Sequence, residues 1–137
     1  MIETDMLYSY IKKEDWLKET ADKFISKIAE GEFGQVYASR ESLHEIYYVS
    51  KQEGANLDEI IRRIAILTAI PNLVFIETSF QIDLLAFVLM KNYGITSVFD
   101  AYYASTALNE IDDHIIVSTD KVYDCLPGLI RKDPRKL

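Results

Sequence analysis

Short apolar segments alternate with longer amphipathic ones along this chain, and this alternation constrains the fold more than any other feature. Residues 36–38, 73–76 and 114–118 have the length and apolar character of buried strands, and helical patterns lie between them. Strands that alternate with helices form a parallel sheet, because right-handed crossovers place helices on both of its faces. The sequence therefore predicts an α/β fold, a three-layer α/β/α sandwich with a central parallel sheet.

Start and stop signals give the expected element boundaries. Trp16, Thr20, Phe24 and Ile28 share one helical face, which predicts a helix that closes near Gly31. Further helices are expected at residues 39–53, 57–69, 82–93 and 100–108. Residues 1–5 are expected to form a strand, and a short helix and a strand near residues 128–131 complete the chain. With no internal repeat and no linker rich in Gly, Pro or Ser, residues 1–137 are predicted to form a single domain.

The chain is acidic, with 15 Lys and Arg residues against 22 Asp and Glu residues and a net charge of −7. This charge argues against a protein that binds phosphate backbones, unless some of the acids hold metal cations and so reverse the local sign. The single cysteine, Cys125, excludes an intrachain disulfide. No segment has the roughly 18 to 20 apolar residues of a membrane span. No signal peptide is expected either, because no basic segment followed by an apolar segment is present. A cytoplasmic protein without membrane contact is expected.

Four acids occupy positions that suit a shared site. Asp5 and Asp120 follow predicted strands, Asp100 opens a helix, and Glu45 lies on the helix after residues 36–38. The carboxyl ends of parallel strands meet at one edge of a sheet, so the four carboxylates are expected to converge there. Gathering them is unfavourable without a cation, and oxygen ligands without Cys or His select Mg²⁺ or Mn²⁺. Asp100 and Asp120 are also typical helix caps, and this second interpretation stays open.

Four segments resemble, in order and spacing, the signatures of the PIN-domain family. They are Glu3-Thr4-Asp5-Met6-Leu7, Ser39-Arg40-Glu41-Ser42-Leu43-His44-Glu45, Phe99-Asp100-Ala101-Tyr102-Tyr103-Ala104 and Val117-Ser118-Thr119-Asp120. The resemblance spans nearly the whole chain, and its opening looks most like archaeal members. It implies a metal-dependent nuclease, most often one that cleaves single-stranded RNA. The length of the chain is similar to that of VapC-type toxins, which pair with a small antitoxin.

The first acid of the family pattern has two candidates in this chain. The family usually has an Asp directly before Thr or Ser, and Glu3 holds that position, whereas Asp5 lies where the family often has Asn or Ser. On a strand, both side chains would point to the same side of the sheet. Asp5 is favoured because it would lie nearer to the end of the strand.

The resemblance implies an Mg²⁺- or Mn²⁺-dependent endoribonuclease that acts on single-stranded RNA. Its implied metal ligands are Asp5, Glu45, Asp100 and Asp120, with Glu3 as a further candidate, and Ser118 or Thr119 is expected to orient a ligand or a water. An antitoxin protein and a second copy of the chain are the expected protein partners.

Two other hypotheses remain open. The first is a PIN-like interaction module without catalysis, in which the acids are only helix caps. The second is a phosphatase of the haloacid-dehalogenase type, whose DxD motif residues 3–5 only approximate.

Overall fold

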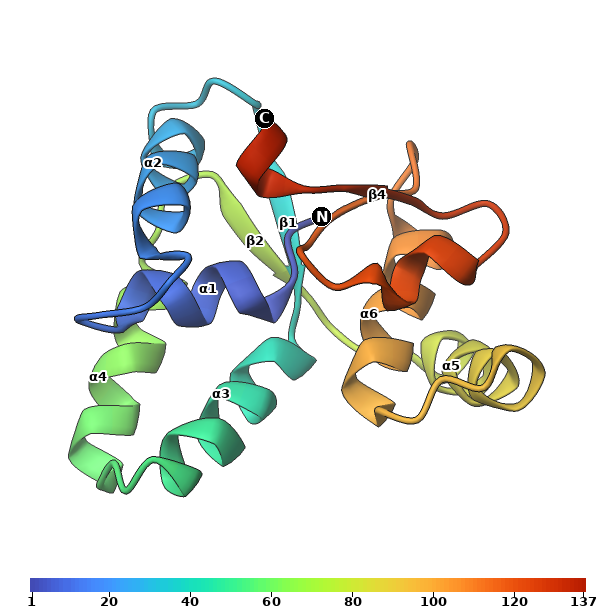
Figure 1. Ribbon diagram of the computed structural model, residues 1–137, viewed down its shortest axis with the longest axis horizontal. Coiled ribbons are helices and arrows are strands. Elements are labelled where there is room, and N and C mark those ends of the chain that lie inside the picture. The colour runs from blue at the N-terminus through green and yellow to red at the C-terminus, as the bar shows by residue number, and fades with distance from the viewer.

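The predicted apolar segments form the strands of a parallel sheet in the computed structural model, which describes residues 1–137 (Figure 1). The strands are β1 (Val36–Ser39), β2 (Leu73–Ile76), β3 (Ile115–Val117) and β4 (Ile130–Lys132). β1 pairs with β2 and β3 with β4, both in parallel. Ile2 bridges Ala38 on one side and Val117 on the other. The N-terminal segment is therefore the central strand, and the order across the sheet is β2, β1, Ile2, β3, β4.

The N-terminal segment is extended only as far as Glu3. Its backbone pairs with both neighbours, since the Ile2 amide donates to the Tyr37 carbonyl at 2.8 Å and the Val117 amide donates to the Met1 carbonyl at 2.8 Å. Helix α1 (Thr4–Ile11) begins immediately afterwards. The prediction of a strand over residues 1–5 is therefore wrong for its last two residues, and α1 was not predicted.

Helices cover both faces of the sheet. They are α2 (Lys18–Ala29), α3 (Glu41–Gln52), α4 (Leu57–Thr68), α5 (Phe80–Tyr93) and α6 (Val98–Glu110), with short 3-10 helices η1 (Lys121–Cys125) and η2 (Pro134–Lys136). Asn56 caps α4 by accepting from the Glu59 amide at 2.9 Å, and Gly94, at φ 70°, ends α5, as their sequence signals predict. The prediction that Trp16 belongs to the helix that contains Phe24 and Ile28 is wrong, because Trp16 precedes α2 and its side chain is 70% exposed.

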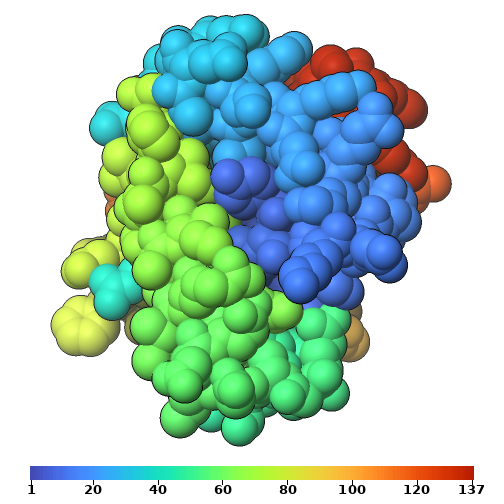
Figure 2. All heavy atoms as spheres, turned by 90° about the vertical axis from the view of Figure 1, so that its left-hand side faces the viewer, coloured from blue at the N-terminus to red at the C-terminus, as the bar shows by residue number.

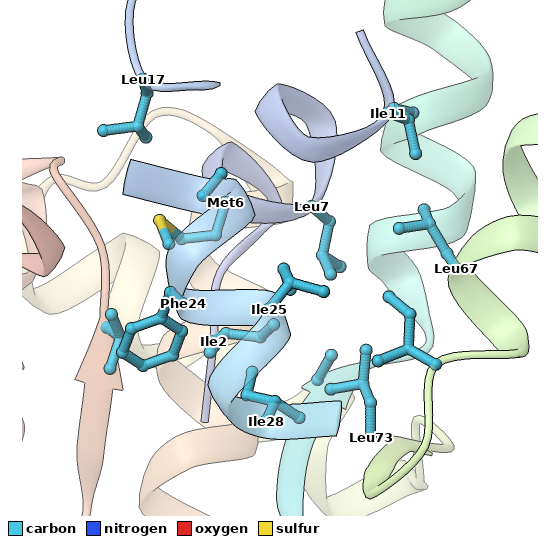
Figure 3. Close-up of a cluster of buried hydrophobic side chains, with 14 of the residues drawn as sticks. Ile2, Met6, Leu7, Ile11, Leu17, Phe24, Ile25, Ile28, Leu67 and Leu73 are labelled. Carbon is cyan, nitrogen blue, oxygen red and sulfur yellow. The ribbon is translucent and has the colours of Figure 1, made fainter. Parts of the chain in front are cut away.

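Two apolar cores make the fold a three-layer sandwich, as predicted. Between the sheet and helices α1, α2 and α4, the buried side chains include Ile2, Met6, Leu7, Ile25, Ile28 and Leu67 (Figure 3). Between the sheet and helices α5 and α6, they include Ala86, Tyr103, Ala104, Ile116 and Tyr123. On the outside of the first layer, α1 lies between α2 and α4 (Figure 2). Each fully buried large aliphatic side chain contributes roughly 1.5 to 3 kcal/mol, so both layers stabilise the sheet.

Helix α5 presents an apolar face to the outside. Phe80, Leu84, Phe87 and Val88 are between 48% and 84% exposed and follow one another at helical spacing. No single helix is long and apolar enough to span a membrane, and α5 and α6 reach the required length and composition only as a pair bent by 115°. Helix α5 therefore packs against α6 on one side and exposes this apolar face on the other.

Candidate active site

The acids singled out in the sequence lie at the carboxyl edge of the central strands, where α1, α3 and α6 meet (Figure 1). Each comes from a different position in the fold. Glu3 ends the central strand, Asp5 lies in the first turn of α1, Glu45 on α3, Asp100 in the first turn of α6, and Asp120 between β3 and η1. The parallel topology therefore brings acids that are distant in sequence to one edge of the sheet.

The geometry of the first two acids corrects the reason for favouring Asp5. The strand ends at Glu3, whose side chain is buried and whose Oε2 accepts a hydrogen bond from the Ser118 hydroxyl at 3.0 Å. Asp5 belongs to α1 and is half-buried; its Oδ2 accepts from the Thr119 amide and the Thr119 hydroxyl, both at 2.8 Å. Glu3 is thus the acid at the strand end, and Ser118 and Thr119 donate hydrogen bonds to the two carboxylates.

Two buried tyrosines contact the carboxylates of Glu45 and Asp100. The Tyr103 hydroxyl donates to Glu45 Oε1 at 3.0 Å, and the Tyr123 hydroxyl lies 3.5 Å from Asp100 Oδ1. Both tyrosines are completely buried. Neither tyrosine is among the site residues expected from the sequence. The only sequence signal for Tyr103 is its position one helical turn after Asp100.

The two carboxylates interpreted as possible helix caps differ in the structure. Asp120 is exposed, and its side chain caps η1 by accepting from the Val122 amide at 2.9 Å. Asp100 is not a cap, because the Ser97 side chain caps α6 and accepts from the Asp100 amide at 3.4 Å. The Asp100 carboxylate is therefore not used as a helix cap, whereas the Asp120 carboxylate is.

The acids repel one another across the edge of the sheet. Burial, with the charges of Asp5 and Glu45, raises the pKa of Glu3 well above its usual value. Burial, with the charges of Asp120 and Glu45, raises the pKa of Asp100 to about 6. Burial also raises the pKa of Glu45. None of these acids forms an ion pair, whereas Asp124 nearby pairs with Arg131 at 2.8 Å. The edge therefore carries uncompensated negative charge, which favours a bound cation.

The donor chemistry of the site fits a hard divalent ion, but the spacing of its side chains does not. Carboxylate oxygens without Cys or His are the ligands that Mg²⁺ and Mn²⁺ take. As the side chains stand, no group of three or more acidic, histidine or cysteine residues has the spacing to hold a metal ion. Asp5 and Asp120 accept from the amides of Thr119 and Val122 instead. These two side chains would have to rotate to become ligands.

A large hollow of about 1140 Å³ opens beside α2. It also runs along the amino ends of β1 and β3 and along the C-terminal segment, where Phe33, Asp113 and Arg135 are among the residues that line it. None of the five acids lines it. The candidate metal ligands therefore belong to the carboxyl edge and not to this hollow.

Fold and site together define a doubly wound α/β domain with an acidic carboxyl edge. The chain belongs to the PIN-domain family, whose model matches residues 1–127, so the resemblance noted in the sequence is confirmed.

The fold is also similar to that in the crystal structure of VapBC2 from Rickettsia felis bound to a DNA fragment from their promoter. The TM-score is 0.70 at 19% identity, over 96% of this chain and 98% of that one. A comparison with curated proteins returns no match. PIN domains are generally nucleases and generally use divalent metal ions.

Proposed function

We propose that this protein is an Mg²⁺- or Mn²⁺-dependent endoribonuclease that hydrolyses phosphodiester bonds in single-stranded RNA. The observation that carries the proposal is the set of carboxylates without ion-pair partners at the carboxyl edge of a PIN fold. Glu3, Asp5, Glu45, Asp100 and Asp120 are the residues that would hold the metal. Such an edge requires a cation before a polyanionic strand can approach it.

The protein's own residues prepare this site. Ser118 donates to Glu3, and the buried Tyr103 donates to Glu45. These hydrogen bonds limit the rotation of carboxylates that would otherwise move apart under mutual repulsion. A Mg²⁺ or Mn²⁺ ion held by these carboxylates would supply Lewis acidity toward the phosphate and toward a water.

A cleavage assay on a set of single-stranded oligoribonucleotides tests the proposal. Cleavage is expected to require a divalent ion, to return when Mg²⁺ or Mn²⁺ is added after chelation, and to be unaffected by zinc-selective chelators. The Asp100→Asn variant, which keeps the shape of the side chain, serves as the inactive control. Activity that persists in excess EDTA would overturn the proposed mechanism.

We extend the proposal to two protein partners. A VapC-like toxin would bind an antitoxin that places a basic side chain at the acidic edge, where a charge-assisted hydrogen bond to a carboxylate is favourable. A second copy of the chain would cover the exposed apolar face of α5. Copurification from the native host tests for the antitoxin. A protein that purifies alone and is harmless when overexpressed would instead be a nuclease without a toxin role.

A PIN-like interaction module without catalysis is the second candidate. Two observations favour it: the acids lack metal-binding spacing, and Asp120 caps η1. The two candidates differ in the response of the folded protein to Mg²⁺. A module would show the same melting temperature with and without the ion, whereas the nuclease would be stabilised by it.

A further inference from the structure

We propose that Trp16 and Arg135 form a binding subsite for single-stranded nucleic acid beside the acidic edge, in which the indole stacks on a base and the guanidinium binds a phosphate. The inference deepens the proposed function and rests on it, because the strand that binds there is the substrate of the acidic edge.

Trp16 is an exposed ring on a fixed backbone. It lies in the turn between α1 and α2 and is 70% exposed, although large aromatic side chains are usually buried. Asp15 fixes this turn, since its Oδ1 accepts from the Ser9 hydroxyl at 2.8 Å and from the Leu17 amide at 2.9 Å. Leu17 is buried and anchors the turn in the core. A rigidly presented and accessible indole is suited to stacking on a base, since every base offers a flat face.

Arg135 places a cation over this ring. Its guanidinium carbon lies 5.6 Å from the centre of the Trp16 ring, within the range of a cation–π interaction. Asp133 binds the Nε and Nη2 atoms of Arg135, so Nη1 remains without a protein acceptor. Lys132 and Lys136, on either side along the chain, are exposed and have no acidic partner within 4.0 Å. The neighbourhood therefore offers unpaired donors of the kind that bind phosphates.

The chain enters the subsite from the edge of the sheet that carries the acids, and Arg135 also lines the hollow along α2. β4 is parallel to β3, and the Ser118 amide donates to the Lys132 carbonyl at 3.1 Å, so η2 starts beside the Ser118–Asp120 loop. The hydrogen bond to Asp133 and, more weakly, the charge of Asp5 raise the pKa of Arg135, so the guanidinium is within electrostatic reach of the acidic edge. A strand that crosses the acids can therefore continue over Arg135 and Trp16.

The charges favour a nucleic acid over a protein at this place. Arg135, Lys132 and Lys136 would repel the basic segment expected of an antitoxin. They attract a phosphate backbone, in contrast to the acidic edge itself. The pair thus offers one reason why a chain with a net charge of −7 can hold a polyanion.

Trp16 is the only tryptophan of the chain, so the intrinsic tryptophan fluorescence reports on this subsite alone. A short single-stranded oligoribonucleotide is titrated in Mg²⁺ into the Asp100→Asn variant, which leaves the strand uncleaved, while the anisotropy of a labelled strand measures binding. We expect tryptophan emission to be quenched with the same midpoint as the anisotropy change. A strand of equal length without bases should bind without quenching. Trp16→Ala should weaken binding roughly 5- to 100-fold, the loss typical of one stacked base.

Matched variants separate stacking from folding. Trp16→Phe retains a ring and should bind nearly as the parent does, whereas Arg135→Gln should bind more weakly and with a smaller salt dependence. Phe33→Ala removes another exposed aromatic ring, one that stacks on Phe24, and should leave strand binding unchanged. Unaltered melting temperatures of Trp16→Phe and Arg135→Gln establish that the fold is intact.

The outcomes distinguish this inference from the proposed function. Strand binding without quenching, or a Trp16→Ala variant that binds as the parent does, overturns the subsite even if metal-dependent cleavage is found. Quenching by the strand together with no cleavage in any metal supports the subsite and overturns the proposed activity. Emission that responds to a copurified protein and not to oligonucleotides also overturns the inference.

Discussion

Glu3 and Asp5 differ in burial and bonding although only Thr4 separates them. Glu3 is buried among the other acids, and Asp5 is held by the amide and hydroxyl of Thr119. We expect Glu3→Gln to lower kcat/KM on an oligoribonucleotide by more than about 100-fold, since loss of even an indirect contact to a metal costs 10- to 100-fold. Asp5→Asn should cost about 10-fold, because an amide oxygen still accepts from Thr119. The opposite order would identify Asp5 as the more important acid.

Asp100 makes the stability of the metal-free protein depend on pH. Its pKa, about 6 through burial and the charges of Asp120 and Glu45, lies above that of an unfolded Asp. The folded state therefore binds the proton more tightly, and the resulting stability is present below pH about 4 and lost as the pH rises through about 6. In EDTA, the melting temperature of the wild type should fall over this range by several degrees more than that of Asp100→Asn. Allowing for the partial exposure of Asp100, we expect the free energy of unfolding of the wild type to fall by about 1 kcal/mol more than that of Asp100→Asn on going to neutral pH.

Mg²⁺ should reverse this comparison. At ~10 mM ion and a dissociation constant of ~1 mM, binding to the folded wild type contributes ~1.4 kcal/mol, a rise of about 5 °C. Asp100→Asn lacks one ligand and should gain much less. Equal shifts in both proteins, or none in either, would contradict the assignment of Asp100 to a metal site.

Helix α6 offers a matched test, because two adjacent tyrosines differ in what they contact. Tyr103 donates to Glu45, whereas Tyr102 is half-buried beside Phe87 on α5. We expect Tyr103→Phe to raise the Mg²⁺ concentration for half-maximal thermal stabilisation about 10-fold, since the carboxylate loses the hydroxyl that orients it. Tyr102→Phe should leave this concentration unchanged. Equal values for the two variants would mean that Tyr103 only packs.

The assembly state of the whole molecule should depend on the outer face of α5. Leu84 is 67% exposed near the middle of that face, and a charge there would be buried without a partner in a dimer. We predict that light scattering finds a dimer for the wild type and a monomer for Leu84→Glu. Ile61→Glu, at a 65% exposed position on α4, should remain dimeric. A monomeric wild type would contradict the prediction.

The sequence predicts those parts of the molecule that depend on local pattern. The runs that became β2 and β3, and the caps at Asn56 and Gly94, are local signals, and the structure confirms them. The start of α1 was missed because no glycine, proline or polar loop separates it from the central strand. Trp16 was placed on a helical face because its spacing continues that of α2 through a turn.

The candidate site was predictable only in part, because a sequence shows local patterns and not contacts between distant residues. Parallel topology places residues beyond the strand ends at one edge, which is why Asp120 and Glu45 were expected there. The contact between Tyr103 and Glu45 joins residues 58 positions apart, and that between Tyr123 and Asp100 joins residues 23 apart. Such contacts arise from the packing of α6 against its neighbours and leave no periodic trace in the sequence.

The central position of residues 1–3 in the sheet ties the acidic edge to the order of events in folding. This segment needs β1 on one side and β3 on the other, and the Glu3 amide donates to the Val117 carbonyl at 3.1 Å. Pairs so distant along the chain form slowly and late in folding. Glu3 and Asp120 can thus share an edge only after β3 has docked beside the N-terminal segment. The acidic edge is therefore among the last features to form, and a folding intermediate in which β3 is still undocked would lack it.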